Sequence, residues 1–261
     1  MKRSTKQRLV QGVLYGVLVI IVVVLALLAD WQAVRENFFD AEVARGLWPE
    51  IVTVGARNTI LYTVIAFVGG LLLAVVLALM KLSPAAPYRW LATAYIEFFR
   101  GLPALLVIII SGFAIPIAFG WRPPGGLVGA GLAALIVVSS AYMAETLRAG
   151  IQAVPKGQTE AARSLGMSGG RTTLSIVLPQ ALRIVIPPLT NEFVLLIKDT
   201  SLLAVIGVAA SQRELTTFAR DENSLTANST PLMVAALLYL VITLPLTQLV
   251  AALERRQQRA R

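Results

Sequence analysis

Long apolar stretches separated by short polar segments make up most of this 261-residue chain. The apolar stretches reach or exceed the roughly 20 residues that a helix needs to cross the hydrocarbon core of a bilayer. Their length and the scarcity of charge within them predict an all-α transmembrane fold with about six membrane-spanning helices. The expected spans are residues 9–29, 58–80, 90–118, 127–154, 176–208 and 231–253.

Two of the expected spans contain helix-disrupting residues. The third contains Gly101-Leu102-Pro103, and the fifth contains Pro179 and Pro187-Pro188. Proline removes a backbone donor and clashes with the preceding turn, so the third helix is expected to bend just after Arg100. Glu97 and Arg100 lie three residues apart, which places them on one helix face where they can pair.

The polar segments suggest four parts: a tail and first helix over 1–29, an extracytoplasmic segment over 30–56, a transmembrane domain over 57–254 and a basic tail over 255–261. A basic start followed by an apolar run is also typical of a signal peptide. The run from residue 9 to 29 is longer than a usual signal core and lacks a convincing small-x-small cleavage site. The sequence therefore favours a retained helix.

The longest polar interruption in the second half of the chain is 155–179. Its charges cannot lie in hydrocarbon, so it is expected at a membrane surface. Pro155 suits a first helical turn, Gly166 can adopt the positive φ of a helix end, and Ser168 can cap the next helix. The segment therefore predicts two short helices joined at Gly166.

The composition agrees with a membrane protein, because 57% of residues are hydrophobic and only 14% are charged. The absence of His and Cys removes imidazole bases, thiol nucleophiles and the commonest zinc ligands, so we expect no catalytic or metal site. Most of the 23 Lys and Arg residues lie in segments that the six expected spans place on the same side of the membrane as the N-terminus. The net charge of +9 is therefore attributed to the positive-inside bias of membrane proteins and not to nucleic-acid binding. This bias places both termini and residues 155–179 in the cytoplasm.

A phosphate-binding loop needs the pattern GxxxxGK[ST]. The stretch from Gly166 to Thr173 is rich in glycine but has neither that spacing nor the lysine. Any use of ATP is therefore expected on another polypeptide, with no cofactor on this chain.

The segment 155–179 carries a recognisable signature: Glu160-Ala161-Ala162, three residues, Gly166, nine residues, and Ile176-x-Leu178-Pro179. It resembles the EAA-x3-G-x9-I-x-L-P signature of inner-membrane subunits of bacterial ABC importers. The resemblance implies a coupling helix that docks on a separate ATPase. The residues expected to make this contact are Glu160, Ala161, Ala162, Arg163, Leu165 and Gly166.

The residues alone support a partner surface, since two alanines allow close approach and Glu160 and Arg163 supply orienting charges. The alternative is a turn that simply faces water.

Further stretches resemble permeases for polar amino acids of the histidine, glutamate, glutamine, arginine and opine branch. They are residues 100–103 (RGLP, like RGTP), 141–150 (like AYxAExxRGA), 178–183 (LPQALR), 187–188 (PP) and 198–202 (KDTSL). The resemblance covers about residues 55–255 and implies a five-span core with an additional N-terminal helix. Leu102 departs from the usual Thr, and Ala149-Gly150 inverts the usual order.

The resemblance also implies an assembly in the bacterial cytoplasmic membrane. Its expected partners are an ATPase dimer that binds ATP and Mg²⁺, a second permease subunit that is identical or a paralogue, an extracytoplasmic solute-binding protein, an amino-acid substrate and membrane lipid. Closure of the ATPase dimer would move the coupling helices and drive alternating access.

Ionisable residues within spans are candidates for the substrate path. They and their polar neighbours are Asn191, Glu192, Lys198, Asp199, Thr200, Ser201, Arg100 and Glu145. An amino acid needs donors for its carboxylate and an acceptor for its ammonium. Lys198 with Thr200 and Ser201, against Asp199 or Glu192, could supply both, as could carbonyls freed by the paired prolines. Alternatively, Lys198 and Asp199 seal a helix end, while Glu97–Arg100 and Glu145–Arg148 are structural pairs.

A different class of function is an ion-gradient-driven secondary transporter or a channel. The coupling signature and the lack of an internal repeat of broken helices in the two halves argue against it.

Overall fold

The computed structural model describes residues 5–120 and 123–259, and every regular element in these ranges is helical. The first half contains α1 (Thr5–Leu28), α2 (Trp31–Phe38), α3 (Ala41–Gly46), η1 (Ile51–Ala56), α4 (Arg57–Leu82), α5 (Ala86–Gly101), α6 (Ala104–Ile109), η2 (Ile110–Ala114) and α7 (Ile115–Phe119). The second half contains α8 (Gly126–Gln152), α9 (Lys156–Ser164), α10 (Gly169–Thr172), η3 (Thr173–Val177), α11 (Leu178–Asp199), η4 (Thr200–Val205), η5 (Ala210–Gln212), α12 (Leu215–Thr226) and α13 (Thr230–Arg259). The extreme ends of both predicted tails and two residues of the polar link 120–126 lie outside the described residues.

Five helical stretches are long and apolar enough to cross a membrane, and a sixth is obtained if a bent helix pair counts as one span. The five are residues 10–28, 51–82, 126–152, 169–205 and 230–255. The prediction of an all-α fold with about six spans is confirmed.

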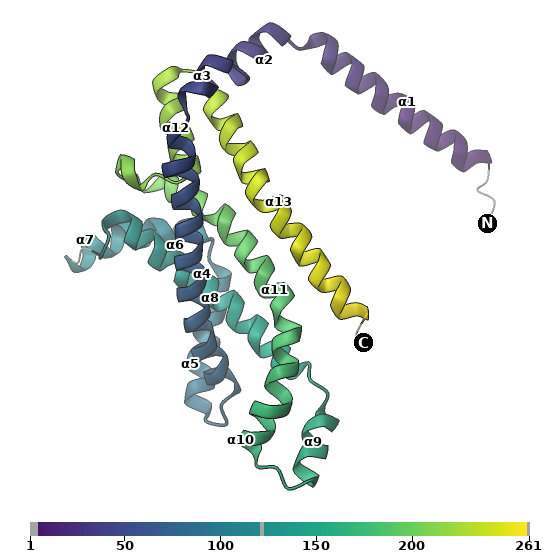
Figure 1. Cartoon of the computed structure of the whole chain (residues 1–261), viewed down its shortest axis with the longest axis vertical. Helices are drawn as coiled ribbons and strands as arrows, with labels where there is room; N and C mark the ends of the chain where they lie inside the picture. Colours follow the sequence, from purple (N-terminus) through teal and green to yellow (C-terminus); the bar gives the residue numbers. More distant parts are fainter. Residues whose placement is uncertain (1–4, 121–122, 260–261) are drawn as a thin grey trace.

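The bent pair is the expected third span. The helix axis turns by 102° between α5 and the following α6, η2 and α7. Leu102 adopts an extended conformation with φ −98° and ψ 138°, because the ring of Pro103 disfavours a helical residue before it. The predicted bend after Arg100 is confirmed, and α6 and α7 run across the direction of α5 (Figure 1).

The helices α4, α8 and α11 form the centre of the bundle. The main apolar core joins Tyr62 and Ala66 of α4 with Leu135 of α8 and Leu196 of α11. Small residues permit close helix approach, since an added Cβ at Gly150 of α8 would overlap the Cγ1 methyl of Val185 on α11. These tight crossings hold the helices that position the candidate site described below.

Replacing Gly150 with Ala is expected to destabilise the bundle by about 1–3 kcal/mol, because the added methyl overlaps Val185, whose branched side chain has little rotamer freedom. Thermal unfolding of the detergent-solubilised chain measures the effect. The control is Gly12→Ala in α1, where no atom lies within 4 Å of the added Cβ. Equal melting temperatures for the two variants would contradict the tight α8–α11 crossing.

Helix α1 lies apart from the bundle. Between residues 10 and 28 no residue is buried in the molecule, although the mean hydropathy of this stretch is 2.8. Figure 1 shows it extending away from α2, well separated from α13. Its place in a membrane therefore depends on its own apolar surface rather than on packing within this chain.

The end of the bundle that carries α2, α3 and α12 is opposite the end that carries α9 and α10 (Figure 1). The polar segment 209–230 between the fifth and sixth expected spans is largely helical, because α12 occupies 215–226 of it. The helix forms because Glu214 caps it: its carboxylate accepts hydrogen bonds from the backbone N–H groups of Thr216 and Thr217, both at 2.6 Å.

Candidate functional site

The first candidate site is the short helical segment between α8 and α11. The predicted pair of helices is present as α9 and α10, and Gly166 between them has a φ of 82°. The Ser168 hydroxyl accepts a hydrogen bond from the Arg171 N–H at 3.4 Å, so the predicted cap is confirmed. The Arg163 guanidinium donates to the Met167 carbonyl at 2.8 Å and braces the turn.

The two faces of α9 differ. Ala162 is only 5% exposed, and α9 packs against η3 on its buried side. Glu160, Ala161 and Arg163 are exposed. The interpretation that both alanines permit close approach therefore applies to Ala161 alone, since Ala162 is used within the molecule.

Leu165 follows α9 and is 84% exposed. A single exposed apolar side chain is common on protein surfaces and is not by itself a contact surface. At this protruding polar tip Leu165 contributes little to the stability of the chain and is free to contact another protein. The small exposed residues Gly157 and Ala161 on the same helix leave its backbone accessible. This end of the molecule therefore presents a surface to which a partner protein can bind.

The second candidate site is a cavity of about 370 Å³ within the bundle. Three parts of the chain form it: the α5–α6 bend, the middle of α8 and the second half of α11. The lining residues are Leu102, Pro103, Ala104, Leu135, Val138, Ser139, Tyr142, Glu192, Leu195, Leu196 and Asp199. The bend at Pro103 thus opens the space that α8 and α11 close from the other sides.

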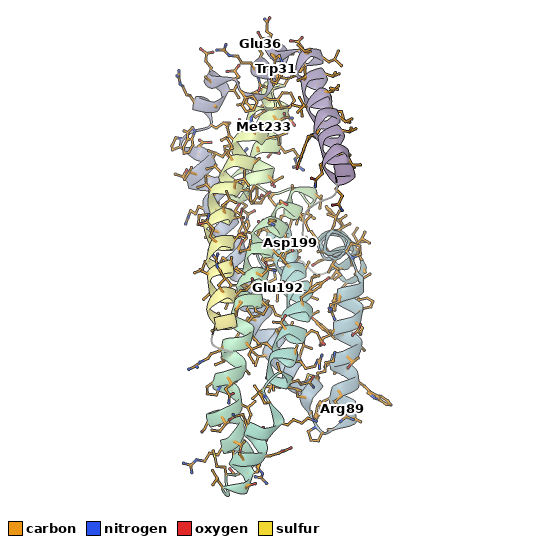
Figure 2. All side chains as sticks on the ribbon, turned by 90° about the vertical axis from the view of Figure 1, so that its right-hand side faces the viewer. Trp31, Glu36, Arg89, Glu192, Asp199 and Met233 are labelled. Carbon is orange, nitrogen blue, oxygen red and sulfur yellow. The ribbon has the colours of Figure 1, made fainter. Side chains whose placement is uncertain are left out.

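Two carboxylates face this mostly apolar cavity. Glu192 and Asp199 are seven residues apart, so both project from one face of α11, and both are half-buried. Figure 2 shows them one above the other along the same helix. No Lys or Arg is among the lining residues, so the cavity is acidic and suited to a cationic group.

A guanidinium lies beside the cavity. The Arg100 Cζ is 5.6 Å from the centroid of the Tyr142 ring, and Tyr142 lines the cavity. The Tyr142 hydroxyl donates to the Arg100 carbonyl at 3.4 Å, which holds α8 against the end of α5. The site thus combines two inward carboxylates with one cation at its side.

The other predicted residues of α11 and η4 lie elsewhere. Asn191 and Lys198 are exposed on a neighbouring face of α11 and do not line the cavity. Thr200 is buried and its hydroxyl donates to the Ile197 carbonyl at 2.7 Å. The Ser201 hydroxyl donates to the Lys198 carbonyl at 2.5 Å. The structure does not bring Lys198, Thr200 and Ser201 together with the two carboxylates as one donor cluster.

Glu145 also lies outside the cavity. It pairs with Arg148, as the spacing allowed, and its Oε2 accepts from the Nζ of Lys81 at 2.9 Å. Lys81 lies in the last turn of α4, so this pair ties the end of α4 to the last third of α8. The prediction that Glu97 can pair with Arg100 is wrong. The described residues contain no ion pair between them, because the Arg100 guanidinium lies over the Tyr142 ring instead.

Sequence reasoning missed a buried polar cluster around Glu214, which is only 1% exposed. Its carboxylate accepts from the Thr217 hydroxyl at 2.6 Å and from the Tyr239 hydroxyl at 3.0 Å. The Leu215 N–H donates to the Thr59 hydroxyl at 3.1 Å. These bonds join α12 to α13 and α4. The combination of Glu214 with threonines two and three residues later could have signalled the cap.

Comparison with known proteins links these features to a family. Residues 70–259 match the family model described as binding-protein-dependent transport system inner membrane component. The probable glutamine ABC transporter permease protein GlnM of Bacillus subtilis is 42% identical over 208 residues, which cover 79% of this chain and 93% of the relative. The arginine transport system permease protein ArtQ of the same organism is 36% identical over 203 residues, covering 77% and 90%.

Solved structures of ABC transporters are also similar to this chain. A crystal structure of an amino acid ABC transporter with histidines aligns with a TM-score of 0.75 and 36% identity, covering 83% of this chain and 98% of the other. A bacterial ABC transporter involved in the import of alginate aligns with a TM-score of 0.66 over 96% of this chain and 98% of the other. At 13% identity, the second likeness concerns the fold alone.

Proposed function

Since this chain belongs to the family of binding-protein-dependent transport system inner membrane components, we propose that it is the permease subunit of an ATP-driven importer that carries a polar or charged amino acid across the bacterial cytoplasmic membrane. The observation that carries the proposal is the family match over residues 70–259, which includes both the protruding α9 and the acidic cavity. The relatives support the substrate class, since their names give glutamine and arginine.

The cavity suits the two charged ends that all amino acids share. Either Glu192 or Asp199 would accept charge-assisted hydrogen bonds from the ammonium group, since seven residues of helix separate the two by about 10 Å. Arg100, at the side of the cavity against Tyr142, would pair with the carboxylate. The apolar walls from Leu135 and Leu196 would lower the local dielectric and strengthen both interactions. That Lys198 and Asn191 contact the substrate elsewhere on its path, outside this cavity, stays a prediction.

The partners follow from the family. An ATPase dimer that binds ATP and Mg²⁺ would hold α9, a second permease subunit would complete the pathway, and an extracytoplasmic binding protein would deliver the amino acid. Leu165 and Ala161 would enter the ATPase, with Glu160 and Arg163 orienting the contact at its edge. Cations such as Lys156 and Arg171 near α9 favour a cytoplasmic position for this end and for both termini.

The packing of α9 suggests how ATP binding reaches the cavity. The buried side of α9 lies against η3, and η3 continues without interruption into α11, which carries Glu192 and Asp199. Closure of the ATPase dimer would displace α9 and thereby move η3 and α11. Pro187 and Pro188 within α11 weaken its backbone ladder and provide a place where this movement can bend the helix. The result would be a change in the side from which the cavity is reached.

The proposal is tested by uptake into vesicles that contain the chain with its ATPase, its binding protein and ATP. Labelled glutamine, arginine and glutamate are offered separately, with a sugar of similar size as control. We expect one amino acid to accumulate and the sugar to be excluded, because the sugar lacks the ammonium and carboxylate that the cavity pairs. Accumulation of the sugar without any amino acid would refute the proposed substrate class.

A further inference from the structure

Helix α12 is fixed firmly at its beginning. The buried carboxylate of Glu214 caps its first turn and accepts a hydrogen bond from Tyr239 of α13 at 3.0 Å. Phe218, in the second turn, is only 1% exposed and belongs to an apolar cluster with Ile51 and Leu215. This half of α12 therefore belongs to the rigid end of the bundle.

The second half of α12 is open to a partner. Leu225 is 77% exposed, although it lies on a helix otherwise rich in polar residues. Figure 1 shows α12 at the end of the molecule opposite α9. In the proposed orientation this half faces the extracytoplasmic side, from which a binding protein arrives.

Arg220 connects this open half to another part of the chain. Its Nη1 donates to the carbonyl of Ala204 in η4, and its Nη2 lies 3.4 Å from Asp221 Oδ1. Asp221 in turn lies 3.8 Å from Arg213, whose guanidinium is 4.7 Å from the centroid of the Phe218 ring. The guanidinium of Arg220 is thus oriented by a neighbouring carboxylate that is itself held in place.

The segment that Arg220 contacts leads directly to the cavity. Helix η4 begins at Thr200, immediately after Asp199, and includes Ala204. Leu203 of η4 and Leu196 of α11 are buried in the same core cluster. The Thr200 hydroxyl also bonds back to Ile197 across the junction between the two helices. Because α11 continues directly into η4 and no glycine lies between Asp199 and Ala204, a displacement of one is expected to move the other.

We infer that Arg220 is a positioning residue through which docking of the substrate-loaded binding protein on α12 is transmitted to Asp199. The inference rests on the proposed function. In this inference, one hydrogen bond connects the outer docking surface to the cavity: the bond from Arg220 to the Ala204 carbonyl. Without that bond the binding protein still docks, but its presence no longer adjusts the position of Asp199.

The test uses the complete complex with its ATPase in lipid nanodiscs and measures ATP hydrolysis against the concentration of loaded binding protein. For Arg220→Gln, we expect the maximal stimulation to fall about 10-fold, within the usual range of coupling between sites. Hydrolysis without binding protein and the half-saturating concentration of binding protein should not change. Arg220→Lys, which keeps a cationic donor, should recover part of the stimulation.

The matched control is Arg35→Gln on α2, which removes one exposed arginine from the same end of the molecule without touching η4. It should behave as the wild type. Full maximal stimulation in Arg220→Gln, or a raised half-saturating concentration with an unchanged maximum, would overturn the inference. A wild-type complex that binds no ATPase, or that binding protein does not stimulate, would instead refute the proposed function, and this inference with it.

Discussion

Replacing Glu192 with Gln together with Asp199 with Asn is expected to reduce amino-acid uptake about 10- to 100-fold. The two carboxylates are the only acidic groups among the cavity-lining residues, and the charge-assisted hydrogen bond that either can make to an ammonium contributes about 1.5–3 kcal/mol. The amide side chains keep nearly the same volume, so the packing of α11 is expected to survive. Initial rates of ATP-driven uptake into vesicles measure the effect.

The control for this variant is Glu97→Gln. Glu97 is also a carboxylate within a predicted span, but it is exposed on α5 and does not line the cavity. ATP hydrolysis by the assembled complex without binding protein should be normal in both variants, which separates loss of substrate binding from loss of assembly. If the double variant transports at the wild-type rate, or Glu97→Gln is equally impaired, the cavity is not the substrate site.

The second large effect is expected at the tip beyond α9. Leu165→Ala removes a side chain that is 84% exposed in the isolated chain, and fully burying a leucine side chain contributes about 1.5–3 kcal/mol. We expect the affinity for the ATPase to fall about 10-fold or more by the same estimate. Copurification and titration with the purified ATPase measure it.

Leu225→Ala is the matched control, because Leu225 is an equally exposed leucine at the other end of the molecule. It should leave the ATPase affinity unchanged. Glu160→Lys reverses an exposed charge on α9 and should weaken the same association without affecting the fold. If the ATPase binds Leu165→Ala and Glu160→Lys as tightly as the wild type, α9 is not its docking surface.

The local features of the fold could be predicted because nearby residues determine them. Apolar runs of about 20 residues marked the spans, Pro103 marked the bend, and Gly166 and Ser168 marked the turn between α9 and α10. In each case the physical cause lies within a few residues of its effect. The sequence did not predict α12 because its 12 residues are mostly polar, with only Leu215, Phe218 and Ala219 as a short buried apolar face, and its stability comes from Glu214 and contacts with distant helices.

The candidate site could be predicted only in part. The sequence identified Glu192, Asp199 and Arg100 as ionisable residues within spans, but could not indicate which of them share a cavity. That depends on how α8 and α11 meet the α5–α6 bend. The pairing of Lys81 with Glu145, 64 residues apart, was invisible for the same reason. The spacing of Glu97 and Arg100 allowed an ion pair, but the Arg100 guanidinium lies over the ring of Tyr142, 42 residues further along the chain.

The most direct test of the central claim is the energy source for uptake. Vesicles are prepared with the chain alone and with the complete assembly of permease, ATPase and binding protein. We expect accumulation only in the complete assembly and only when ATP is present on the side of the ATPase. Accumulation by the chain alone on a sodium or proton gradient, without nucleotide or a second protein, would contradict the account.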